Sequence, residues 1–105
     1  MNSERLKMLH QFAEEEPGNA FNWYALALEY QHSDPSQASQ LFEKLMTEFE
    51  SYLPTYYMAA NHYLRQGDTE KAVSIFRKGI EIAEQQGDRK AAGELRSGLD
   101  EVLFE

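Results

Sequence analysis

The feature that most constrains this chain is an apolar pattern that occurs twice. The stretch from Leu53 to Ile82 repeats the plan of the stretch from Trp23 to Phe49. Each stretch contains two segments with the apolar spacing of a helix, joined by a short turn. Matching positions lie 33 residues apart before the turn and 34 residues apart after it. Self-similarity at this period is typical of a repeat built from pairs of helices.

The matching positions are mostly large aromatic or small side chains. They pair Trp23 with Tyr56, Leu26 with Ala59, Ala27 with Ala60, Tyr30 with Tyr63, Ala38 with Ala72, Phe42 with Phe76, and Leu45 with Gly79. We predict that these aromatic residues form a core and hold no cofactor. Glycine inside a helix costs about 1 kcal/mol relative to alanine, so we expect a neighbouring helix to approach Gly79 closely.

Six helices are predicted from the apolar spacing and from the residues that begin and end helices. They span Ser3 to Glu15, Asn19 or Ala20 to His32, Pro35 to Phe49, Pro54 to Gln66, Glu70 to Gln86, and Arg89 to Leu103. In the first helix we expect an apolar face of Leu6, Leu9, Phe12 and Ala13. Asp34, Gly67 and Gly87 are predicted to lie at helix ends, because aspartate caps helix starts and glycine ends helices. Connections of two to four residues make sequence neighbours pack antiparallel.

The composition narrows the possible functions. At 105 residues the chain suits one domain. Its net charge is −8, and no Lys or Arg occurs between Met8 and Glu43, so nucleic acid and anionic membranes are unfavourable partners. The absence of cysteine excludes disulfides and thiolate metal sites. No segment approaches the about 18 apolar residues of a membrane span, and we expect a soluble, cytoplasmic protein.

Two motifs resemble the tetratricopeptide repeat. The first is W-x2-L-A-x2-Y, which begins at Trp23 and is followed by Ala38 and Phe42; the second is Y-x2-A-A-x2-Y, which begins at Tyr56 and is followed by Gly67-Asp68. The first copy departs from the family's pattern, because its turn is one residue shorter and Leu45 stands where a small residue is usual. The resemblance implies an all-α solenoid of antiparallel helix pairs with a right-handed superhelix. It divides the chain into an N-terminal half repeat (1–18), two repeats (19–52 and 53–86) and a C-terminal capping helix (87–105).

The resemblance also implies where a partner binds, because members of this family generally hold a peptide or protein segment in a concave groove. The groove is lined by the first helix of each pair, which places there Phe21, Tyr24, Leu28, Gln31 and His32, and then Pro54, Tyr57, Asn61, Leu64 and Arg65. Tyr24 and Tyr57 are the expected anchors, since both lie off the core face. Some members clamp a terminal carboxylate with Lys, Asn and Arg, but Tyr24, Leu28 and Met58 occupy those places here. We therefore expect no such clamp, and a neutral or basic partner segment.

Self-association and catalysis are two alternative functions. The last helix carries apolar residues toward its end, Leu95, Leu99, Val102, Leu103 and Phe104, and could join two copies of the chain instead of covering the last repeat. An enzyme is disfavoured, because the chain has no H-E-x-x-H, P-loop or G-x-S-x-G motif. His10, His32 and His62 lie on different predicted helices and are expected at the surface. We predict a non-catalytic adaptor without metal or cofactor.

Overall fold

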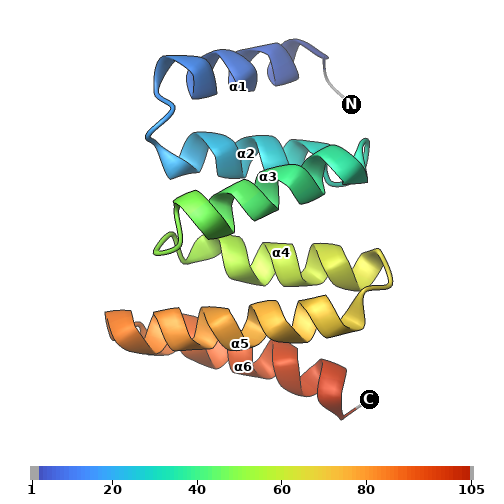
Figure 1. Cartoon of the computed structure of the whole chain (residues 1–105), viewed down its shortest axis with the longest axis vertical. Helices are drawn as coiled ribbons and strands as arrows, with labels where there is room; N and C mark the ends of the chain where they lie inside the picture. The colour runs from blue at the N-terminus through green and yellow to red at the C-terminus, as the bar shows by residue number, and fades with distance from the viewer. Residues whose placement is uncertain (1–2, 105) are drawn as a thin grey trace. The chain divides into compact units, whose positions relative to one another are not determined.

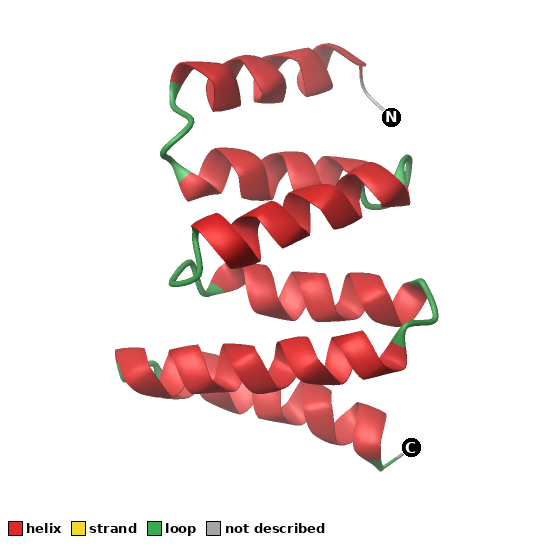
Figure 2. Ribbon diagram, in the orientation of Figure 1, coloured by secondary structure: helices red, strands yellow, loops and turns green. Residues whose placement is uncertain are grey.

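A computed structural model describes residues 3–104 of the chain (Figure 1). Over these residues the chain forms six helices and no strand (Figure 2). The helices are α1 (Ser3–Glu15), α2 (Ala20–Tyr30), α3 (Pro35–Glu48), α4 (Pro54–Arg65), α5 (Thr69–Gln86) and α6 (Arg89–Leu103). The predicted all-α class and the six helices are confirmed.

The helix ends follow the capping chemistry expected from the sequence. Asp34, Asp68 and Asp88 each accept a backbone N–H from three residues ahead, at 3.2, 3.2 and 3.0 Å. Gly67 and Gly87 adopt left-handed backbone, with φ of 83° and 71°. An L side chain is strained in this conformation, so these two turns require glycine.

The predicted boundaries hold for α1 and α6 and differ slightly elsewhere. Helix α2 ends at Tyr30, two residues before the predicted His32. Beyond it, the N–H of Ser33 donates to the Tyr30 carbonyl oxygen at 3.1 Å, a 3₁₀-type bond that tightens the last turn. Asp34 then caps α3. Helix α5 begins one residue earlier than predicted, and α3 and α4 each end one residue earlier.

The chain forms two compact units, the first ending at Tyr52 and the second beginning at Leu53. In the first unit α2 packs against α1 and against α3; in the second α5 packs against α4 and against α6. Within each unit, helices adjacent in the sequence run antiparallel (Figure 1), as the short connections predicted. The proposed division of the chain into repeats and half repeats stays a prediction.

The core of the second unit is built from two aromatic rings that face glycines. A Cβ atom added at Gly79 would lie 2.6 Å from Cβ of Tyr56 and 3.1 Å from Cδ1 of Leu95. A Cβ added at Gly98 would lie 2.6 Å from the ring of Phe76. The predicted close approach at Gly79 is confirmed: α4 and α6 contact α5 where one partner has no side chain.

The core of the first unit contains Leu26, Ala27, Ala38, Phe42 and Leu45, all fully buried. Trp23 is half-buried at its margin; its indole N–H donates to the Pro17 carbonyl oxygen at 2.8 Å, and the Lys44 ammonium lies 4.6 Å from its ring centroid. The prediction for Phe12 is wrong, because 46% of this side chain is exposed. Helix α2 packs against a different side of α1, where Ala13 is the buried residue of α1.

The three histidines lie in three different environments. His32 is exposed, and His10 is half-buried with Nε2 2.7 Å from the Tyr30 hydroxyl. His62 is fully buried on α4, so its predicted surface position is wrong. Burial lowers the pKa of His62, and the positive charge of Arg65 lowers it further. The error arose because α4 buries residues around a wider sector than the single face marked by the aromatic motif.

Candidate functional site

The second unit has a hollow of about 460 Å³ between α4 and α6. Its lining consists of Tyr57, Asn61, Leu64, Thr69, Gly98, Glu101 and Val102. Three of these residues follow one another at i, i+4 and i+7 on α4, and this spacing places Tyr57, Asn61 and Leu64 on one face of the helix. These three were predicted from the sequence as partner-facing, and the structure brings them together.

Tyr57 is the aromatic residue of this hollow. The residue is 43% exposed, and its ring lies edge-on to Phe76 with 6.1 Å between the ring centroids. Because Phe76 is itself buried in the core, it supports one part of the tyrosine while the rest faces solvent. A supported, partly exposed tyrosine offers apolar area together with a hydroxyl group for hydrogen bonding.

The polar groups of the hollow define the ligand chemistry that it suits. Asn61 donates its side-chain N–H to the Tyr57 carbonyl oxygen at 2.9 Å, which fixes the amide and leaves its oxygen as an acceptor. Glu101, which is exposed, is the charged residue of the lining. Leu64 and Val102 are half-buried and apolar. The hollow therefore suits an apolar side chain beside a donor or a positive charge.

Arg65, also predicted as partner-facing, is exposed at the end of α4 and is not among the residues of the lining. Thr69, Gly98, Glu101 and Val102 line the hollow but were not predicted. For two of them a signal existed, because Gly98 and Val102 lie at helical spacing with Leu95 in α6. That spacing could not indicate which residues of α4 they would face.

Most of the residues predicted as partner-facing in the first unit are only partly exposed to solvent. Phe21 is 57% exposed, whereas Tyr24, Leu28 and Gln31 are half-buried. The ring of Tyr24 lies edge-on to that of Tyr52, with centroids 5.6 Å apart. Burial raises the pKa of Tyr24, and the neighbouring Tyr52 raises it further. Tyr52 therefore covers part of the expected anchor, which sequence spacing did not reveal.

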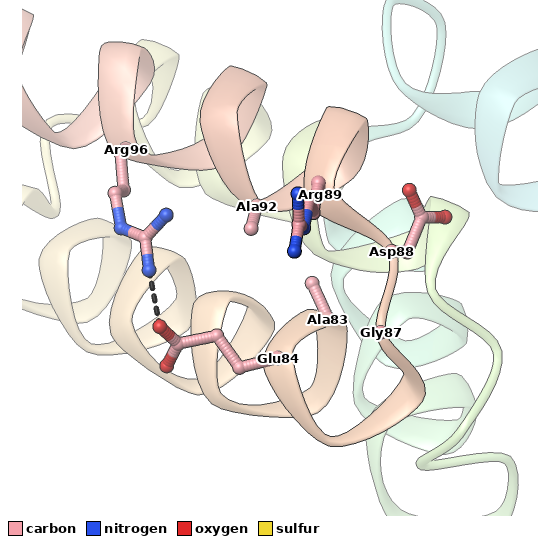
Figure 3. A pocket seen from close by; sticks show the side chains of 7 residues that line it. All are labelled: Ala83, Glu84, Gly87, Asp88, Arg89, Ala92 and Arg96. Atoms are coloured by element: carbon pink, nitrogen blue, oxygen red, sulfur yellow. Dashed lines mark hydrogen bonds and ion pairs between the residues drawn. The ribbon is translucent and has the colours of Figure 1, made fainter.

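A second hollow of about 440 Å³ lies at the turn between α5 and α6 (Figure 3). It is lined by Ala83, Glu84, Gly87, Asp88, Arg89, Ala92 and Arg96. Figure 3 shows Arg96 reaching from α6 to form an ion pair with Glu84 on α5. Arg89 and Arg96 are balanced by Glu84 and Asp88, and Asp88 also caps α6. The hollow thus has no excess charge to select a charged ligand.

No group of three or more His, Asp or Glu side chains within residues 3–104 is placed to hold a metal ion. No helix in the same range has the length and apolar character needed to cross a membrane. In α6, Leu95 and Leu99 are buried and Leu103 is 45% exposed, and Phe104 directly after the helix is 81% exposed.

Comparison with known proteins identifies the family. Residues 29–96, which are more than half of the chain, match the tetratricopeptide repeat. The chain belongs to the tetratricopeptide repeat family. The prediction made from the two aromatic motifs is therefore confirmed.

Two solved structures support this assignment, both of tetratricopeptide repeat domain proteins from Salinibacter ruber. The NMR structure is 34% identical to this chain with a TM-score of 0.79, and the match covers 85% of this chain and 92% of that one. The crystal structure is 33% identical with a TM-score of 0.76, and covers 82% and 98% respectively. No curated protein matches the sequence. Tetratricopeptide repeat domains are generally non-catalytic modules that bind protein or peptide partners.

Proposed function

We propose that this tetratricopeptide repeat protein is a non-catalytic adaptor, and that the hollow between α4 and α6 docks a segment of a partner protein. The observation that carries the proposal is the convergence of Tyr57, Asn61 and Leu64 with residues of α6 around one open hollow. Such an arrangement supplies a rigid aromatic anchor, apolar walls and a few polar groups. These are the features of surfaces that bind peptides.

The partner segment is expected to be neutral or basic, with an apolar residue beside a lysine or arginine. The apolar residue would pack against Tyr57 and Leu64, and the cation would pair with Glu101. The net charge of −8 favours the same choice over an acidic segment or a nucleic acid. Binding should weaken as salt is added, because exposed charges are screened within about 10 Å at 0.1 M salt.

The predicted residues of the first unit offer a second surface, in which Phe21 is the most exposed side chain. Residues 1–52 contain nine acidic and three basic residues, whereas residues 53–105 contain nine and seven. A basic segment is therefore expected to be attracted more strongly to the first unit at long range. The α4–α6 hollow remains the primary proposal because Tyr24 is partly covered by Tyr52.

The test is selection of random peptides on the wild-type chain, followed by affinity measurements on variants. Selected peptides should combine apolar and basic residues, and Tyr57→Ala should weaken their binding about tenfold, as for a moderate interface anchor. Glu101→Gln should reduce the salt dependence. Gln85→Ala, on an exposed position of α5 outside both hollows, should change neither.

Three results would contradict the proposal. Peptides that bind Tyr57→Ala as well as wild type would remove the hollow from the site. A loss of binding with Phe21→Ala alone would move the site to the first unit. Selection of acidic peptides would refute the predicted partner chemistry.

A further inference from the structure

Helix α1 carries an uncovered stripe that the proposed function does not use. Its members are Arg5, Met8, Phe12 and Glu15, which lie within one sector of the helix because their spacings are three, four and three residues. Met8 is 55% exposed and Phe12 is 46% exposed. Among the exposed large apolar side chains of residues 3–104, only this pair lies four residues apart on one helix.

Helices α3 and α5 are the second helices of the two predicted repeats, and each has a corresponding stripe that is buried. The stripes consist of Ala38, Leu41, Phe42 and Leu45 in α3, and of Ala72, Ile75, Phe76 and Gly79 in α5. In sequence Phe42 precedes Tyr56 by 14 residues, and Leu9 precedes Trp23 by 14. This register places Arg5, Met8, Leu9 and Phe12 at the same four positions in α1. Three of these four belong to the exposed stripe, and the fourth, Leu9, is half-buried.

The exposure of Met8 and Phe12 follows from this correspondence. In α5, Gly79 of the equivalent stripe packs against Tyr56 of the preceding helix α4, while the Phe76 ring packs against Gly98 of the following helix α6. Helix α1 packs against α2, and Figure 1 shows no helix of the first unit along its opposite side. Helix α1 thus leaves exposed positions that the equivalent helices bury.

The charges of the stripe specify which helix could cover it. Arg5 supplies a positive charge at one end and Glu15 a negative charge at the other, with Met8 and Phe12 between them. The stripe is self-complementary: when two copies of α1 run antiparallel about His10, Arg5 faces Glu15 and Met8 faces Phe12, twice over. We propose that two copies of this chain associate through α1 in this antiparallel arrangement, each covering the exposed stripe of the other.

The other contacts of the charged residues allow this pairing. Arg5 forms an ion pair with Glu29 at 3.1 Å, but 66% of its side chain is exposed. Glu15 accepts a hydrogen bond from Gln11 at 2.9 Å, and is also exposed. A two-fold symmetric contact uses one surface patch on both partners. The contact uses one face of a single helix from each copy, so we expect a weak, concentration-dependent dimer.

Charge reversal gives a test that depends on this geometry. The Arg5→Glu variant has acids at both ends of the stripe, and the Glu15→Arg variant has bases at both ends. In sedimentation over a range of concentrations, each variant alone should associate about tenfold more weakly than wild type, because two ion pairs become repulsive. An equimolar mixture of the two should associate as wild type does, since every facing pair is again opposite in charge.

Two further variants keep the test decisive if a charge change disturbs α1. Met8→Ser removes an apolar side chain that is more than half exposed, and should abolish association while leaving the helical circular dichroism unchanged. The chain has no cysteine, so Met8→Cys mixed with Phe12→Cys should form crosslinked heterodimers faster than either forms homodimers. Phe104→Ser serves as the control on α6.

A wild-type chain that stays monomeric throughout would overturn the proposal. So would a mixture of the charge variants that fails to regain association, or a loss of association in Phe104→Ser with Met8→Ser unaffected. The first two results would leave no dimer through α1, and the third would place the dimer on α6. None of these outcomes bears on the hollow of the second unit, which is tested separately.

Discussion

The contact between α4 and α5 at Gly79 gives the sharpest prediction about stability. Replacing this residue with alanine adds one methyl group, whose carbon would lie 2.6 Å from Cβ and 3.1 Å from Cγ of Tyr56. Carbon atoms in contact are about 3.5 Å apart or more. Because Cβ of Tyr56 is attached directly to the α4 backbone, rotation of a side chain cannot relieve the overlap. The two helices must separate by about 0.9 Å.

Two opposing effects decide the size of the change. Alanine is favoured over glycine inside a helix by about 1 kcal/mol. Overpacking a well-packed core costs about 1–3 kcal/mol, and we expect the upper part of that range because the overlap involves the backbone-proximal Cβ. Gly79→Ala should therefore lower the free energy of unfolding by about 1–2 kcal/mol.

The assay is urea denaturation and thermal melting followed by circular dichroism. For a chain of this size the melting temperature should fall by roughly 4–8 °C for each kcal/mol lost. Gly93→Ala in α6 is the matched control, because it is exposed and a Cβ there meets nothing within 4 Å. This control should gain about 1 kcal/mol from helix propensity alone. If Gly79→Ala stabilises the chain as much as Gly93→Ala does, the argument from close packing is refuted.

Two further predictions concern a helix cap and a buried histidine. Asp88→Ala removes the side-chain acceptor of the Ala91 N–H and should cost about 1 kcal/mol in urea denaturation, whereas Asp88→Asn keeps an acceptor and should cost little; equal losses would contradict the capping role. The pKa of His62 is lowered in the folded chain, whereas in the unfolded chain it has the ordinary histidine value of about 6.5. As the pH falls through about 6.5, the unfolded chain therefore binds more protons than the folded chain, and the free energy of unfolding should fall. The advantage of wild type over His62→Gln in unfolding free energy should therefore shrink between about pH 8 and about pH 5, and a difference that is independent of pH would disprove it.

Local features of the sequence predicted the helices and their ends well. Asp34 and Gly87 could be placed because capping and left-handed backbone depend on neighbouring residues only. The same holds for the family, since aromatic and small residues at the repeat period reflect contacts within one helix pair. The end of α2 was missed by two residues, where the Ser33 N–H bonds the Tyr30 carbonyl oxygen three residues back and the last turn tightens to 3₁₀ geometry.

Burial was harder to predict, because helical spacing identifies an apolar face but not what covers it. Phe12 has the spacing of a core residue, yet 46% of it is exposed. His62 lies off the aromatic stripe and is fully buried. Both errors concern packing partners, which spacing within a single helix does not specify.

The candidate site was predicted in part for the same reason. Tyr57, Asn61 and Leu64 share one face of α4, so their convergence followed from helix geometry. Glu101, which supplies the charge of the hollow, lies 37 residues beyond Leu64 in the sequence. The ring contact between Tyr24 and Tyr52 likewise joins residues from different segments. Whether a partner uses these residues stays a prediction.

The division into two units also makes the chain suited to a particular folding measurement. The single tryptophan, Trp23, belongs to the unit that ends at Tyr52. Its fluorescence therefore monitors that half alone, whereas far-ultraviolet ellipticity averages over all six helices. Superimposable denaturation curves from the two signals would mean that both halves melt as one cooperative block, and any gap between the midpoints would measure their independence.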